Sequence, residues 1–212
     1  MADALTLSKK YKTLLDRAGI NTPLRLAHFF SQAEHESGLE PVSENLNYAS
    51  TALQSVFGSK RISLSDANKY GRTSKQKANQ EAIANIVYGG DWGLKNLGNK
   101  VWGDGWKYRG RGWFQVTGLS NYQSLTKYAQ NTLKLNVDYV KNPDLLANES
   151  DSAIGAIWYW NMRNLNAYAD KDDIDGVSDI INMGRKTQAY GDAKGFIDRL
   201  SKLKKYKTLF KA

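Results

Sequence analysis

Acidic side chains crowd one short stretch of the sequence, residues 33–50, AEHESGLEPVSENLNYAS. The stretch contains one histidine and four glutamates: Glu34, His35, Glu36, Glu40 and Glu44. Two carboxyl groups can divide the roles of general acid and general base, and an inverting glycosidase separates them by roughly 6.5–9.5 Å to admit a water. Glu36 ends an apolar helical pattern and fits the acid, because desolvation disfavours the charged carboxylate. Glu44 lies on a polar loop and fits the ionised base. Solvated surface carboxylates are the alternative reading of the same residues.

The sequence contains few residues that could form other kinds of catalytic centre. The chain has no cysteine and two histidines, His28 and His35, which leaves little for thiol chemistry or a zinc site. The motifs G-x-S-x-G, G-x-x-x-x-G-K-[ST] and H-E-x-x-H do not occur. We therefore expect neither a metal nor an organic cofactor.

The length and composition predict one globular domain over residues 1–212. The 212 residues are 41% hydrophobic, and no repeat, linker tract or long apolar segment interrupts them. Lys plus Arg number 30 against 21 Asp plus Glu, a net charge of +9, which favours an anionic partner. Seven basic residues and one acidic residue lie in the segment 194–212, so much of the positive charge belongs to a basic C-terminal helix.

The spacing of hydrophobic residues predicts a mainly α-helical chain. Thr22 and Pro23 are a strong helix start, and Gly38 with Pro41 ends that helix, so His35 and Glu36 fall at its far end. Nine of the 18 glycines and four of the six tryptophans lie between residues 89 and 118, a composition that suits either the wall of a sugar-binding cleft or a long irregular loop. Helical patterns cover residues 7–18, 22–38, 50–57, 78–87, 148–162 and 196–210.

Two blocks of the sequence resemble glycoside hydrolase family 19, the chitinase-like fold used by many phage endolysins. Residues 27–50, AHFFSQAEHESGLEPVSENLNYAS, contain the HE pair and the E-N-L-N-Y stretch of that family. Residues 108–122, YRGRGWFQVTGLSNY, are similar to its Y-R-G-R-G-x-x-Q-L-T-G-x-x-N-Y. The resemblance implies a mainly α, lysozyme-like bilobal domain with a central cleft, at most a small β element, and an inverting mechanism without a cofactor.

The resemblance also implies roles for single residues. Glu36 would be the general acid, Glu44 the general base, and Thr117 would help to hold the attacking water. Gln115 and Thr117 are expected on one face of a short strand-like run, opposite Val116. The side chains expected beside the substrate are His35, Gln115, Asn121 and Asn182, with a neutral structural role as the alternative for His35.

The C-terminal part departs from the family pattern. Ile181-Asn182-Met183-Gly184 stands where the family often has I-N-G-G, and residues 185–199 also differ. A methionine at the lip of a cleft would alter the shape of a subsite. Arg199 could match the buried arginine that pairs with carboxylates in the family.

From the resemblance we expect a peptidoglycan hydrolase, an endolysin that cleaves the β-1,4 bond between N-acetylmuramic acid and N-acetylglucosamine and lyses the bacterial host. The N-terminal segment MADALTLSKKYKTLLDRAGI contains no apolar stretch of signal-peptide length. The expected location is therefore the host cytoplasm until release to the cell wall, through a holin. The expected partners are peptidoglycan glycan strands, bound by a monomer, and no nucleic acid.

Several alternatives remain open from the sequence. The family also includes chitinases, and a non-catalytic wall-binding protein on the same fold would be expected to lack one of the carboxylates. Nucleic-acid binding explains the charge but not the carboxylate motifs. The basic C-terminal helix could contact an anionic outer or inner membrane, or it could dock its apolar stripe on the core with its lysines in solvent.

Overall fold

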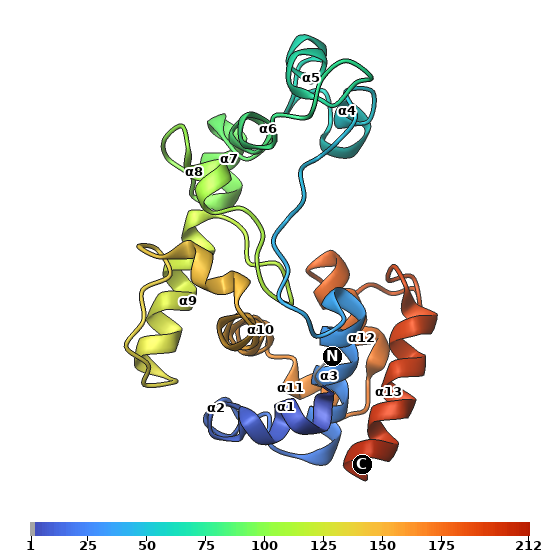
Figure 1. Ribbon diagram of the computed structural model, residues 1–212. Coiled ribbons are helices and arrows are strands. Elements are labelled where there is room, and N and C mark those ends of the chain that lie inside the picture. Colours follow the sequence, from blue (N-terminus) through green and yellow to red (C-terminus); the bar gives the residue numbers. More distant parts are fainter. Residues whose placement is uncertain (1–2) are drawn as a thin grey trace.

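The computed structural model describes residues 3–212 and consists of helices joined by loops (Figure 1). Isolated bridges are the β pairings found in this range, and they join Ser43 to Arg111, Arg111 to Val116, and Ala49 to Arg72. The predicted mainly α fold with at most a small β element is confirmed. The elements are α1 (Ala4–Lys10), α2 (Lys12–Arg17), α3 (Pro23–Ser37), α4 (Leu53–Phe57), α5 (Leu64–Tyr70), α6 (Gln80–Val87), α7 (Gly90–Leu97), α8 (Asp104–Lys107), α9 (Leu119–Asn131), the 3-10 helix η1 (Pro143–Ala147), α10 (Glu149–Met162), α11 (Asn166–Ala169), α12 (Ile174–Met183) and α13 (Phe196–Phe210).

Two groups of buried hydrophobic residues divide the molecule into two lobes. The large lobe is built on α1 to α3 and α9 to α13, and the small lobe on α4 to α6. Two extended segments, around residues 38–50 and 108–118, run between the lobes in Figure 1. The core of the small lobe consists of Leu46, Leu53, Ile62, Ala67, Ile83, Ala84 and Val87.

Helix α3 begins and ends where the sequence predicts. The side chain of Thr22 accepts a hydrogen bond from the backbone N–H of Arg25, and Pro23 occupies the first turn. Gly38 ends the helix in the left-handed conformation, with φ of 66°. The helix thereby carries Glu36 in its last turn, at the edge of the large lobe.

Helix α13 lies along α3 and buries its apolar stripe there (Figure 1). The ring centroid of Phe30 lies 6.4 Å from that of Tyr206 and 5.7 Å from that of Phe210. Lys205 pairs with Glu34 at 2.9 Å, so part of the C-terminal charge is neutralised by the large lobe. The helix is thus docked on the core, and membrane contact through it stays a prediction. Within residues 3–212, no helix is both long and apolar enough to cross a membrane.

The sequence patterns and the structure differ in several places. The helix expected over residues 7–18 is divided into α1 and α2 at Tyr11, whose ψ of 15° lies outside the helical range. The region between residues 89 and 118 contains two short helices, α7 and α8, which the sequence does not predict because glycine is a poor helix former. Helices α5, α9, α11 and α12 were not predicted.

The strand-like run expected around Gln115 is a tight turn. Arg111 and Val116 pair through both backbone hydrogen bonds, at 2.8 and 3.2 Å, and the chain reverses between them. Gln115 adopts φ of 50°, a left-handed conformation that is costly for a residue with a side chain. The strand prediction was wrong because Gly112, with φ of 84°, lets the chain turn instead of extending.

Candidate active site

Glu44 is held through its backbone and through both carboxylate oxygens. Its N–H donates to the carbonyl of Gly110 at 2.8 Å, and the N–H of Gly112 donates to the carbonyl of Val42 at 2.8 Å. The N–H of Gly110 in turn donates to Oε2 of Glu44 at 3.1 Å, and the hydroxyl of Tyr88 donates to Oε1. Donors on both oxygens fix the orientation of the carboxylate. The glycine-rich block therefore holds the carboxylate expected to act as a base.

Three of the predicted site residues converge on Gly110. A Cβ atom at this position would lie 2.6 Å from Oε1 of Gln115, 3.1 Å from Oγ1 of Thr117 and 3.3 Å from Oε2 of Glu44. These oxygen atoms therefore surround one point, and a larger residue at position 110 would push into them. The left-handed conformation of Gln115 brings its side chain to this point although the run is not a strand.

Asn121 supports Thr117 from the first turn of α9. Its Nδ2 donates to the carbonyl of Thr117 at 2.7 Å, and Oγ1 of Thr117 donates to the carbonyl of Gln115 at 3.1 Å. Asn121 therefore lies beside the cluster of Glu44, Gln115 and Thr117, which we call the Glu44 group. Its amide nitrogen fixes the backbone that carries the hydroxyl of Thr117.

Arg111 fastens the same segment to the large lobe. Its side chain is 1% exposed; Nη2 donates to Oδ1 of Asp144 at 2.6 Å and Nη1 to the hydroxyl of Tyr122 at 2.8 Å. An arginine this deeply buried needs such partners, because an unpaired buried charge is costly. The sequence motif contains this arginine, but sequence reasoning gave it no function.

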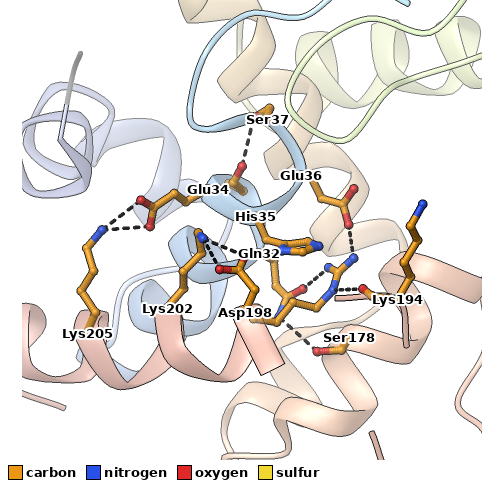
Figure 2. A network of polar contacts seen from close by, with 12 residues as sticks. Gln32, Glu34, His35, Glu36, Ser37, Ser178, Lys194, Asp198, Lys202 and Lys205 are labelled. Atoms are coloured by element: carbon orange, nitrogen blue, oxygen red, sulfur yellow. Dashed lines mark hydrogen bonds and ion pairs between the residues drawn. The ribbon is translucent and has the colours of Figure 1, made fainter. Parts of the chain in front are cut away.

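Glu36 forms an ion pair with Arg199 in the network of Figure 2. The Nη2 group of Arg199 donates to Oε1 of Glu36, and its Nη1 donates to Oε1 of Gln32 at 2.5 Å. Arg199 is 2% exposed and Glu36 is 29% exposed. Glu36 thus faces a guanidinium and solvent, in place of the apolar surroundings expected for it. Arg199 does pair with a carboxylate, as its match to the family's arginine implies.

His35 lies on the same turn as Glu36 but faces α13 (Figure 2). Its Nδ1 lies 2.6 Å from Oδ2 of Asp198, and its ring packs so closely on Gly195 that a Cβ there would come within 2.3 Å of it. These contacts join α3 to the start of α13 and correspond to the structural alternative for His35.

Asn182 is linked to the Glu36 pair through the backbone of Lys194. Its Oδ1 accepts from the N–H of Lys194 at 3.0 Å, and the carbonyl of Lys194 accepts from Nε of Arg199 at 3.1 Å. Asn182 therefore belongs with Glu36 and not with the Glu44 group. No hydrogen bond between side chains joins the two groups in the part of the chain that the structure describes.

An acidic cluster anchors the segment that departs from the family pattern. Oxygen atoms of Asp175, Asp179 and Asp192 lie within 4.8 Å of one another, a spacing that could suit an ion. The ammonium group of Lys186 contacts Asp175 and Asp179, and Oγ1 of Thr187 donates to Asp192 at 2.9 Å. The lysine thus balances part of the charge, and the cluster fixes the loop between α12 and α13.

Tyr88 is the residue of the site that sequence reasoning missed. It follows the last turn of α6, where its ring packs edge-on against Phe57 at 6.1 Å between centroids. Burial, and next the negative charge of Glu44, raise the pKa of the Tyr88 hydroxyl well above its ordinary value. The hydroxyl therefore stays protonated and remains a donor to Glu44. Its only sequence signal is a tyrosine at the end of a predicted helix.

Replacing Tyr88 with phenylalanine removes this donor and keeps the ring. We expect kcat to fall by about tenfold, since a hydrogen bond to a charged group contributes about 1.5–3 kcal/mol. Tyr48→Phe is the control, since Tyr48 lies near Glu44 but gives it no hydrogen bond. Equal kcat values for the two variants would contradict the role of Tyr88.

Two known proteins are similar to this chain over much of its length. A protein of Haemophilus influenzae described as a glycosyl hydrolase family 19 domain-containing protein is 34% identical over 171 residues, which cover 80% of this chain and 76% of that protein. An acidic endochitinase of Petunia hybrida is 32% identical over 108 residues, 50% of this chain and 39% of the endochitinase. No family model matches the chain.

Proposed function

The chain belongs to glycosyl hydrolase family 19 and is a glycoside hydrolase, and from this premise we propose that its substrate is the glycan of bacterial peptidoglycan. It cleaves the β-1,4 bond between N-acetylmuramic acid and N-acetylglucosamine and acts as an endolysin that lyses the host. The gathering of oxygen atoms of Glu44, Thr117 and Gln115 around Gly110 carries the hydrolytic part of the proposal, because a water held beside these oxygens has a base and polar partners.

In this mechanism Glu44 is the general base. The donors Tyr88 and Gly110 hold its carboxylate in place, and the hydroxyl of Thr117 helps to orient the water. Glu44 takes a proton from this water as the water oxygen bonds to the anomeric carbon. The configuration at that carbon is inverted.

Glu36 is the general acid and works from the large lobe. Its proton passes to the glycosidic oxygen as the bond from the anomeric carbon to that oxygen breaks. The ion pair with Arg199 is the resting arrangement, which fixes the position of the carboxyl group. Bound glycan excludes water from the bond that breaks, so that the glycosidic oxygen is the acceptor of this proton.

The charge of the chain supports peptidoglycan over chitin. The net charge of +9 attracts an anionic polymer and speeds encounter with it, whereas chitin is uncharged. In this proposal the protein stays in the host cytoplasm until a holin gives it access to the wall. Chitin is the second candidate, which the resemblance to a protein named as an endochitinase favours.

The test is to identify the products on purified sacculi of a Gram-negative bacterium and on chitin hexamer. New muramic acid reducing ends support the proposal, and products that begin in the inverted anomer support the mechanism. Glucosamine reducing ends would show a glucosaminidase instead. Cleavage of chitin hexamer alone would show a chitinase, and binding to sacculi without products would show a wall-binding protein.

A further inference from the structure

Two arginines near Glu44 lie flat on tryptophan rings. The guanidinium carbon of Arg61 is 3.6 Å from the ring centroid of Trp92, and that of Arg109 is 3.7 Å from the ring centroid of Trp106. Both arginines are half-buried. Such stacking holds a guanidinium in one orientation and leaves its edge open to a ligand.

Both arginines belong to the surroundings of the proposed base. Arg61 also lies over the ring of Tyr88, 5.5 Å from its centroid, and the hydroxyl of Tyr88 donates to Glu44. Arg109 directly precedes Gly110, whose N–H donates to the same carboxylate. Burial lowers the pKa of both guanidinium groups, while the charge of Glu44 acts in the opposite direction on each.

Neither arginine has a carboxylate partner within 4.0 Å among residues 3–212, although Arg25, Arg111 and Arg199 each have one. Nε and Nη2 of Arg61 donate to the carbonyl of Val87 at 2.9 and 2.7 Å, and Nη1 of Arg109 donates to the carbonyl of Trp106 at 3.0 Å. Their other N–H groups find no acceptor in this range, and they are not sealed from solvent. These free N–H groups are therefore available to an anionic ligand that approaches from solvent.

We propose that Arg61 and Arg109 bind carboxylate groups carried by the glycan and thereby select peptidoglycan over a neutral polymer. A planar guanidinium matches a carboxylate with two parallel hydrogen bonds, and partial burial strengthens the attraction relative to open water. The stem peptides carry free carboxylates on this substrate, and the lactyl group of muramic acid carries one wherever its peptide has been removed. The inference rests on the proposed function and assigns two residues to its specificity.

The experiment compares one substrate in charged and neutral forms. Solubilised peptidoglycan is used as isolated and after its carboxylates are converted to amides with carbodiimide and ammonia. The measured quantity is the ratio of kcat/KM on the charged form to that on the amidated form, for the wild type, Arg61→Gln, Arg109→Gln and the double variant. Each ratio comes from one enzyme preparation, so any misfolded fraction cancels.

We expect the wild type to prefer the charged form and each single variant to lose about tenfold of that preference, as the loss of a charge-assisted hydrogen bond implies. The control is Lys69→Gln, which removes a positive charge from the same lobe where Lys69 lies 4.9 Å from the ring centroid of Tyr70. This control should keep the wild-type ratio. A further substrate, stripped of its peptides by an amidase and thereby given free lactyl carboxylates, shows which carboxylates the arginines accept: dependence on the arginines that persists there shows binding of the lactyl carboxylate, and dependence that disappears shows that the carboxylates of the stem peptides are required.

An unchanged ratio in the double variant would overturn the inference, as would an equal loss of activity on both forms, which is the result expected of purely structural arginines. If the wild-type protein cleaves chitin hexamer but neither form of peptidoglycan, the proposed substrate fails and the inference fails with it. Cleavage of peptidoglycan with unchanged ratios overturns the arginine assignment alone.

Discussion

Glu36→Gln should lower kcat on the glycan substrate by about 10²–10⁴-fold, the usual contribution of a general acid. Glutamine keeps the size of the side chain and can still accept from Arg199, so the fold should be preserved. The loss arises because an amide cannot protonate the leaving oxygen. The measurement is the initial rate of release of reducing ends, with a thermal melt to establish that the variant is folded.

Glu44→Gln should cause a loss of similar size for a different reason, since the attacking water then lacks a base. The two losses should not add in the double variant, because both residues serve one step. Glu40→Gln is the matched control, an exposed glutamate between the two on the same segment. A folded Glu36→Gln variant with wild-type rates would remove Glu36 from the mechanism, and the same holds for Glu44.

Arg199→Met should reduce both stability and activity. The change leaves Oε1 of buried Gln32 without its donor and Glu36 without its cation, and we expect the free energy of unfolding to fall by about 3 kcal/mol. The partial exposure of Glu36 keeps this loss at the low end of the range for buried pairs. The catalytic rate should fall at least tenfold at temperatures where the variant is folded, because Glu36 loses its fixed position.

Urea denaturation measures the loss of stability, and Arg25→Met is its control. Arg25 lies on α3, the helix that carries Glu36, and pairs with Asp170 at 2.6 Å. Both groups are partly exposed, so we expect this variant to lose about 1 kcal/mol or less. Equal losses for the two variants would show that the Arg199 network contributes no more than a surface ion pair.

The sequence predicts helix α3 well because the signals for its two ends are local. Thr22, Pro23 and Gly38 define the ends of the helix by backbone chemistry that operates within a few residues. The paired glutamates and the block around Gly110 were recognised as motifs, and the structure does bring Glu44, Gln115 and Thr117 together. For these residues, their position within a motif was sufficient to predict that they lie close together.

The remaining elements depend on contacts that local patterns do not specify. Helix α9 has Gly118 as its N-cap residue, with no side-chain capping bond, so it presents no strong start signal. Helix α12 does begin with a capping side chain, since Asp173 accepts from the N–H of Gly176, but the glycine within its first turn weakens the helical pattern. Tyr88 meets Glu44 across 44 residues of sequence. Arg61 likewise stacks on Trp92, which lies far from it in the sequence. These two are tertiary contacts, which no local periodicity encodes.

The small core beneath Tyr88 should make catalysis the first property lost on heating. Seven residues form the buried centre of the small lobe, and α6, which ends beside Tyr88, contributes Ile83, Ala84 and Val87 to it. A unit with so few apolar contacts is expected to open at a lower free-energy cost than the large lobe. Each opening would release Tyr88, one of the groups that fix the Glu44 carboxylate, while α3 and α13 remain packed. We therefore expect thermal inactivation to be a subglobal event that precedes the melting of the whole chain.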